Sequence, residues 1–276
     1  MQFRFPVCAI VVASVLAAAI GGARAHDEKK YPDLRGQWRR VGSAEWTPAG
    51  QKPTLTPEYQ AIYDAGLKDQ LAGGHGTEPS YMCLPPGMPR AMLAYTQMEV
   101  VVTQDTTYIL IDHINDNRRI FTDGRDWPAE IEPSFRGYSI GKWLDEDGDG
   151  RYDALEVETR NFKGPRAYDT TGLPLHSDNQ TVVKERIYFD KADPNVFYDD
   201  ITTIDHALTK PWMVTRTYRR SNDPRPEWLE MNCAEGNTHL HLGNENYFIG
   251  ADGLLMPAKK NQAPPDLKWF KQLKKE

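Results

Sequence analysis

Residues 145–156 carry the side chains best suited to chemistry in this chain, because they fit a twelve-residue calcium-loop pattern at every specified position. Asp145, Asp147 and Asp149 can each offer a carboxylate oxygen, and Gly150 permits the sharp turn around an ion. The predicted metal ligands are Asp145, Asp147, Asp149, the Arg151 backbone carbonyl, Asp153 through a water molecule, and a bidentate Glu156. We therefore expect a bound calcium ion.

An acidic hairpin turn is the alternative, since Asp and Gly favour turns for backbone reasons alone. Such a turn has no need of a glutamate at the twelfth position, and this favours calcium. The flanking segments 137–144 and 155–162 are rich in β-forming residues, so the loop should lie at the tip of a β-hairpin rather than between paired helices. Without helices to move, the ion is expected to be structural.

A second group of ionisable residues could support acid–base chemistry. Glu158 and Glu185 lie on predicted strands, and with His176 and Arg119 they are candidates for a general acid, a base and an electrostatic clamp. This role requires strand faces that line a polar barrel interior. On an outer face the same residues would form surface ion pairs of little energetic value, and strand alternation favours the outer face.

Two further clusters are weaker. Residues 118–125 gather three arginines around Asp123, which could attract an anionic partner or could be a solvated hairpin end with an internal ion pair. His239 and His241 point to the same side of an extended segment, but no third ligand accompanies them to fix a transition metal. The sequence contains no nucleophile elbow, P-loop or dinucleotide-binding motif, so nucleotide-dependent chemistry is not expected.

The N-terminal residues indicate export. Arg4 precedes an apolar run from Val7 to Ile20, and Ala23 and Ala25 occupy the small-residue positions of a secretory cleavage site. We expect a signal peptide over residues 1–25, cleaved after Ala25, and a periplasmic or secreted bacterial protein; a retained anchor is the alternative. Cleavage removes two arginines and no acidic residue, so the formal net charge of −6 becomes −8, which disfavours nucleic-acid and anionic-lipid partners.

Two cysteines, Cys83 and Cys233, remain after that cleavage. Export passes through a compartment that oxidises thiols, so we predict a disulfide bond between them; two buried free thiols are the alternative. Such a bond would contribute about 2–4 kcal/mol to stability.

One helix and a series of strands must position these residues. Thr56 as a cap and Pro57 at the first helical position predict a helix over about 57–71. Short β-rich runs separated by turn signals predict strands at 99–102, 108–112, 120–122, 139–144, 155–162, 181–189, 196–204 and 212–219. The expected fold is mainly β, a single antiparallel β-barrel or sandwich of lipocalin-like type with one N-terminal helix. The expected organisation is a signal peptide (1–25), an N-terminal segment (26–80), a β domain (81–240) and a C-terminal extension (241–276).

Several motifs follow one another in a defined order over most of residues 35–235. They are Cys83-Leu-Pro-Pro-Gly-Met-Pro-Arg90, Arg118-Arg119 before Ile120-Phe-Thr-Asp-Gly-Arg125, Gly137-Tyr-Ser-Ile-Gly-Lys-Trp143, Val157-Glu-Thr159, Pro174-Leu-His-Ser177 with Glu185-Arg186, and Asn232-Cys233. In these motifs the chain resembles a widespread family of exported bacterial proteins of unassigned biochemical function. The resemblance implies no particular activity.

The chain departs from that family pattern at two places. The resemblance implies a tight acidic turn between Trp143 and Val157 in the relatives, where this chain has the calcium loop, and a histidine in place of Trp127. A loop added to a hairpin that relatives make without metal implies a local stabilising role. The missing histidine argues against an acid–base role at position 127.

Two functions from different classes follow. The first is a binding protein, in which some of the 13 tyrosines, 7 tryptophans and 9 phenylalanines line a pocket for a small apolar or aromatic compound. The second is a periplasmic acid–base enzyme, a lyase, isomerase or hydrolase, that uses the Glu158, His176, Glu185 and Arg119 group on a small molecule. Binding is the first of the two hypotheses.

Overall fold

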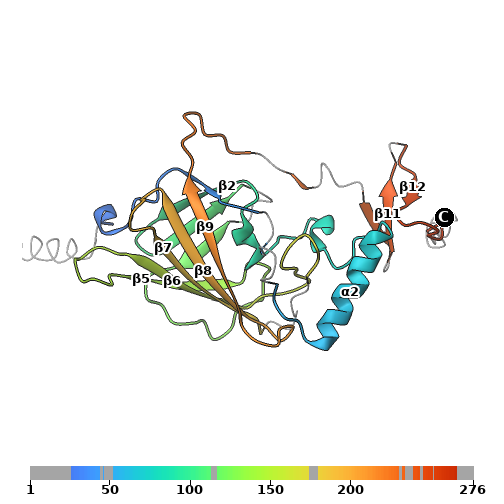
Figure 1. The fold of residues 1–276 in the computed structure, drawn as a ribbon, viewed down its shortest axis with the longest axis horizontal. Coiled ribbons are helices and arrows are strands. Elements are labelled where there is room, and N and C mark those ends of the chain that lie inside the picture. Colours follow the sequence, from blue (N-terminus) through green and yellow to red (C-terminus); the bar gives the residue numbers. More distant parts are fainter. Residues whose placement is uncertain are drawn as a thin grey trace, which may run out of the picture.

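Nine strands close into a β-barrel in the computed structural model, which describes residues 26–43, 46, 52–112, 117–173, 180–229, 232–233, 239–242, 245–250 and 252–265. The barrel strands are β1 (Gln37–Arg40), β2 (Gln97–Val102), β3 (Thr106–Ile111), β4 (Arg118–Phe121), β5 (Tyr138–Leu144), β6 (Ala154–Arg160), β7 (Val182–Phe189), β8 (Val196–Ile204) and β9 (Trp212–Arg220). Each strand pairs with the next along the chain, and β9 pairs with β1 to complete the circle (Figure 1). The mainly β prediction is confirmed, and of the two architectures expected the barrel is the one that forms.

One pair of neighbouring strands is parallel. Ile120 of β4 lies opposite Ser139 of β5, and Phe121 lies opposite Ile140. Parallel neighbours need a crossover connection, and residues 122–137 supply it. The expectation of a purely antiparallel barrel is wrong at this pair, because the turn signal at 122–125 begins a long connection instead of closing a hairpin.

The barrel takes its first strand from outside the bounds expected for the β domain. β1 lies in the segment 26–80, where Trp38 is opposite both Met98 of β2 and Arg220 of β9. Trp38 is fully buried, but the rest of this four-residue strand is polar, so it has no alternating hydrophobic pattern. The eight strands predicted from the sequence all form.

Apolar and aromatic side chains fill much of the barrel interior. The Trp38 ring packs edge-on against Phe197 with 4.8 Å between centroids, and Phe197 stacks on Tyr218 at 4.8 Å. Other fully buried residues of this core include Met92, Leu93, Met98, Ile109 and Ile120. Many of the aromatic residues counted as possible pocket lining are therefore core residues.

A buried segment between the helix and β2 packs against the barrel. Residues 86–94, here called the plug, are buried throughout and include the 3₁₀ turn η3 (Arg90–Leu93). The Met92 carbonyl accepts a hydrogen bond from the Tyr218 hydroxyl, and the Leu93 carbonyl accepts one from Arg40 Nε at 2.6 Å. The backbone of the plug therefore satisfies polar side chains of β1 and β9. Two further 3₁₀ turns are η1 (Glu28–Lys30) and η2 (Pro79–Met82).

The predicted helix forms as α2 (Pro57–Leu71) and stands beside the barrel (Figure 1). Thr56 is its N-cap and Pro57 its first residue, and the chain leaves it through Gly73, whose φ of +94° suits glycine. Its buried Tyr63 bonds the Thr171 hydroxyl at 2.9 Å. Within the described ranges, no helix has the length and apolar character to cross a membrane.

The C-terminal part folds into a small three-stranded sheet, where a simple extension from residue 241 was expected. Its strands are β10 (His239–Leu242), β11 (Glu245–Ile249) and β12 (Leu255–Pro257), and β11 and β12 lie near one end of α2, away from the barrel (Figure 1). The predicted disulfide bond joins Cys83 and Cys233, whose Cα atoms are 5.6 Å apart. It ties the chain before the plug to the chain before this sheet.

Candidate functional site

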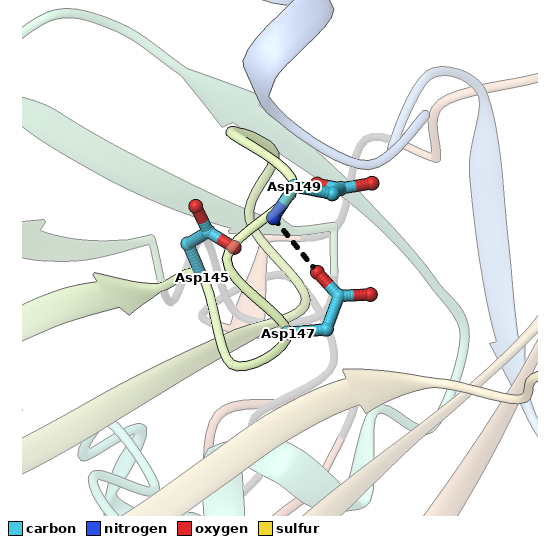
Figure 2. Close-up of side chains that lie close together, drawn as sticks. All are labelled: Asp145, Asp147 and Asp149. Carbon is cyan, nitrogen blue, oxygen red and sulfur yellow. Dashed lines mark hydrogen bonds between the residues drawn. The ribbon is translucent and has the colours of Figure 1, made fainter.

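The acidic loop lies at the tip of the β5–β6 hairpin, as predicted. Leu144 and Ala154 are the last paired residues on either side of it. Asp145, Asp147 and Asp149 can each turn an oxygen toward a common point, with these ligand atoms all within 4.8 Å of one another (Figure 2). Three hard carboxylate oxygens in one group suit a hard divalent cation such as calcium.

Backbone N–H groups hold the loop in this shape. The Asp145 carboxylate accepts hydrogen bonds from the N–H groups of Gly148 at 2.8 Å and Gly150 at 2.9 Å. Asp147 accepts one from Asp149 at 3.1 Å, drawn as the dashed line in Figure 2. Both glycines have positive φ, of +76° and +89°, which explains why glycine stands at these positions.

The remaining predicted ligands lie elsewhere in the hairpin. Asp153 accepts a hydrogen bond from the Glu146 N–H at 2.8 Å. Glu156 is an exposed residue of β6 opposite Lys142 and Arg186, and Arg151 is exposed in the loop. Three of the carboxylates therefore lie close enough together to hold a metal ion, whereas Glu156 would have to turn away from its neighbouring strands to join them.

The loop is anchored to the N-terminal segment 26–36, here called the strap. The Tyr152 N–H donates to the Lys30 carbonyl at 2.7 Å. The Tyr31 ring contacts Tyr152, with centroids 5.0 Å apart, and contacts Trp143 edge-on at 5.3 Å. A change in the conformation of the loop would therefore alter its contacts with the strap and the packing of three aromatic rings.

Of the four acid–base candidates, the three that the structure describes are not brought together. Glu185 points into the barrel and forms a two-point ion pair with Arg118, with N–O distances of 2.7 and 2.9 Å. Glu158 lies on the other face of the sheet, paired with Arg160 and with Lys184 at 3.6 Å. Arg119 is exposed and sits over the Tyr108 ring. His176 lies outside the described residues.

Strand β8 carries a buried carboxyl group that the sequence analysis did not include among the acid–base candidates. Asp199 is fully buried, and no donor among the described residues is hydrogen-bonded to either of its carboxylate oxygens. Burial raises the pKa of Asp199 well above its ordinary value of 3.8, and the nearby Glu185 raises it further, while Arg118 opposes the shift. Arg216 lies directly opposite it on β9, and burial lowers the pKa of this guanidinium. The sequence did contain a signal for this buried carboxyl. Successive side chains of a strand point to opposite faces, so either Asp199 or Asp200 of β8 must point inward.

The two weaker clusters resolve into local contacts. Asp123 and Arg125 form the expected internal ion pair, at 2.6 Å, whereas Arg118 of the same sequence cluster points into the barrel. The His239 ring contacts His75 at 4.3 Å between centroids, and the side chain of His241 lies outside the described residues. Among described residues, the three loop aspartates are the one cluster in which three or more possible metal-ligating side chains lie close together.

Two hollows flank Tyr31. The first, here called the groove, has a volume of about 970 Å³ and lies over strands β5–β8 between Tyr31 and the 122–125 turn. The second, here called the cleft, has a volume of about 720 Å³ and lies between the strap and β2. Both fall in the size range of small-molecule sites, which is roughly 300–1,000 Å³.

Comparisons with protein-family models, with curated proteins and with solved structures find no match to this chain. The resemblance to an exported bacterial family stays a prediction. Function is therefore argued from the chemistry of the sites.

Proposed function

We propose that this protein is an exported, calcium-braced β-barrel that binds a small apolar or aromatic compound in the cleft. The supporting observation is the lining of the cleft. Val100, Val101 and Val102 of β2 form one side, and Leu34 and Tyr31 of the strap contribute to the other. Val101 is 43% exposed although it belongs to a barrel strand, so a ligand resting on it would remove apolar surface from water.

The rim of the cleft is polar. Arg35 and Asp33 form an ion pair there at 2.8 Å, and Glu99 and Arg151 also border the space. The cleft therefore combines an apolar patch with a rim of charged side chains, and in a small-molecule site the apolar part supplies affinity while the polar groups fix orientation.

Calcium belongs to this proposal as a brace. The loop that would hold it bonds the strap through Tyr152 and Lys30, and the strap forms one wall of the cleft. A bound ion would neutralise the repulsion among Asp145, Asp147 and Asp149 and so hold the loop in the shape that meets the strap.

Export is supported by the disulfide bond, because such bonds persist in oxidising compartments. The enzymatic alternative has less geometric support. It required Glu158 and Glu185 to share one face, and they lie on opposite faces of the sheet. A polar interior does exist, but its ionisable residues Arg118, Glu185 and Asp199 are buried.

A fluorescent apolar probe tests the binding site. The uncharged aromatic dye N-phenyl-1-naphthylamine should bind saturably, with one site per chain, and gain fluorescence. Val101→Lys places an ammonium group among the apolar residues of the cleft and should weaken the affinity for the dye by about tenfold or more. Met213→Lys is the matched control, because Met213 is 74% exposed on β9 and does not line the cleft.

The control variant should bind the dye as the wild type does. Equal affinity of the dye for Val101→Lys and wild type, or no saturable binding to the wild type, would contradict the proposed site.

A further inference from the structure

The floor of the groove is a ladder of alternating charges. Lys142 of β5 lies opposite Glu156 of β6, Glu156 lies opposite Arg186 of β7, and Arg186 lies opposite Asp200 of β8. Directly opposed residues in a sheet point to the same face, with Cβ atoms about 4.5–5.5 Å apart. The floor therefore presents a cation, an anion, a cation and an anion in one row.

A second row runs beside the first. Glu158 of β6 lies opposite Lys184 of β7, which lies opposite Thr202 of β8. All three line the groove. Donors and acceptors thus alternate in two dimensions across the floor.

The charges of the floor balance within each row, and several are already engaged. Arg186 binds Glu146 at 2.6 Å, Lys184 lies 3.6 Å from Glu158, and Asp200 accepts a hydrogen bond from Thr215 at 2.6 Å. An anionic ligand would meet the carboxylates of β6, and a cationic ligand would meet the amino and guanidinium groups of β7. The floor suits a neutral ligand that donates hydrogen bonds to carboxylates and accepts them from cations.

One end of the groove is aromatic. Tyr31, Trp143 and Tyr152 line it together and touch one another, with centroids 5.0 to 6.1 Å apart. Each of these residues is only partly exposed, so the rings offer edges and parts of faces to the groove. Aromatic rings pack well against the C–H face of a ligand whose other edge is polar.

We propose that the groove is a second binding site, for a neutral polyhydroxylated ligand, that is, a saccharide. Hydroxyl groups act as both donors and acceptors, which is what the alternating floor requires. The C–H face of a sugar ring matches the aromatic end. The site shares Tyr31 with the cleft but differs from it in floor, charge and ligand class.

Binding of uncharged sugars tests this inference. The probes are methyl pyranosides of glucose, galactose, mannose and N-acetylglucosamine, together with their di- to tetrasaccharides, measured by calorimetry and by ligand-observed NMR. At least one should bind the wild-type protein. Lys142→Met and Lys184→Met keep the aliphatic stem but remove a charged donor. Each should weaken the affinity for that sugar by about tenfold.

Two controls separate binding in the groove from binding in the cleft and from a general effect of lost surface charge. Lys210→Met changes an exposed lysine outside the groove and should leave the sugar affinity unchanged. Val101→Lys alters the cleft and should also leave sugar binding intact, so a failure of the proposed function does not carry over to the groove.

Three results would overturn the inference. They are the absence of binding by every sugar at about 10 mM, equal affinity of both groove variants and wild type, and loss of sugar binding in Val101→Lys, which would place the sugar in the cleft.

Discussion

Asp199 is a residue whose protonation depends on the fold. Within the part of the chain that the structure describes, its oxygens have no hydrogen-bond donor, and the side chain is shielded from water. An ionised carboxylate in that position would have lost its hydration without gaining hydrogen bonds, which explains why burial and Glu185 raise its pKa. Above the ordinary value of 3.8, the folded protein keeps a proton that the unfolded chain has lost.

This residue should make the protein less stable as pH rises. The folded state binds more protons than the unfolded state between the ordinary and the raised pKa, so the contribution of Asp199 to the free energy of unfolding falls across that interval. Asp199→Asn keeps the size but cannot titrate. Urea denaturation from about pH 4.5 to about pH 8 should show the variant gaining stability relative to wild type as pH increases.

Asp200→Asn is the matched control, because its side chain lies on the outer face of the same strand. The control should keep the loss of stability with rising pH, reduced somewhat because the charge of Asp200 is one of the smaller causes of the raised pKa of Asp199. Parallel profiles for wild type and Asp199→Asn would show that this carboxyl does not titrate differently on folding.

Individual site residues were predicted where the local pattern determines their position. The loop aspartates lie together because twelve consecutive residues contain the whole motif. Glu158 and Glu185 could not be assigned to a face in the same way, because their strands carry polar residues on both faces. The inward position of Glu185 depends on its ion pair with Arg118, which lies far away in the sequence.

At the scale of elements, the β5–β6 hairpin connects the acidic loop to the rest of the protein. Arg186 of β7 reaches Glu146 in the loop, and the Tyr152 N–H binds the strap. Order in the loop is therefore coupled to β7 and to the strap.

Calcium should stabilise the protein through this hairpin. With the affinity of about 10⁻⁴–10⁻³ M that is common for extracellular sites, about 10 mM calcium should add about 1.4–2.7 kcal/mol and raise the melting temperature. Asp147→Ala should lose most of this gain, whereas Asp126→Ala, an exposed aspartate outside the loop, should keep it. Melting curves with calcium and with chelator measure both.

The same titration has an optical readout. Tyr152 belongs to the loop and Trp143 lies beside it, so wild-type fluorescence should change with calcium and that of Asp147→Ala should not. If the melting temperature of the wild-type protein is the same with calcium and with chelator, the bound calcium ion in the proposal is contradicted.

The elements that were predicted correctly have strong local signals. Thr56 and Pro57 start α2, and alternation and turns outline the eight strands. β1 and the parallel β4–β5 pair were missed for a common reason. The formation of a short polar strand, and the parallel or antiparallel direction of a neighbouring strand, depend on contacts between residues far apart in the sequence, such as Trp38 and Arg220.

At the scale of the whole molecule, the Cys83–Cys233 bond links two regions that are 150 residues apart. Cys83 precedes the plug, and Cys233 lies between β9 and the small C-terminal sheet. The bond thus restricts the unfolded chain over the complete length of strands β2–β9.

Removing this bond should cost about 2–4 kcal/mol. Guanidinium denaturation of a Cys83→Ala, Cys233→Ala double variant should show that loss relative to oxidised wild type, and wild type with a reductant should match the variant. Thiol titration of the unreduced protein should detect neither cysteine. Two titratable thiols at these positions would contradict the bond.

The pairing of β1 with β9 imposes an order of events on synthesis. The strand nearest the N-terminus leaves the ribosome long before its partner Trp212–Arg220 is made, and until then two unpaired sheet edges are exposed to other chains. A premature stop before Arg220 is thus more hazardous than loss of everything after it, because the latter still lets the ring close.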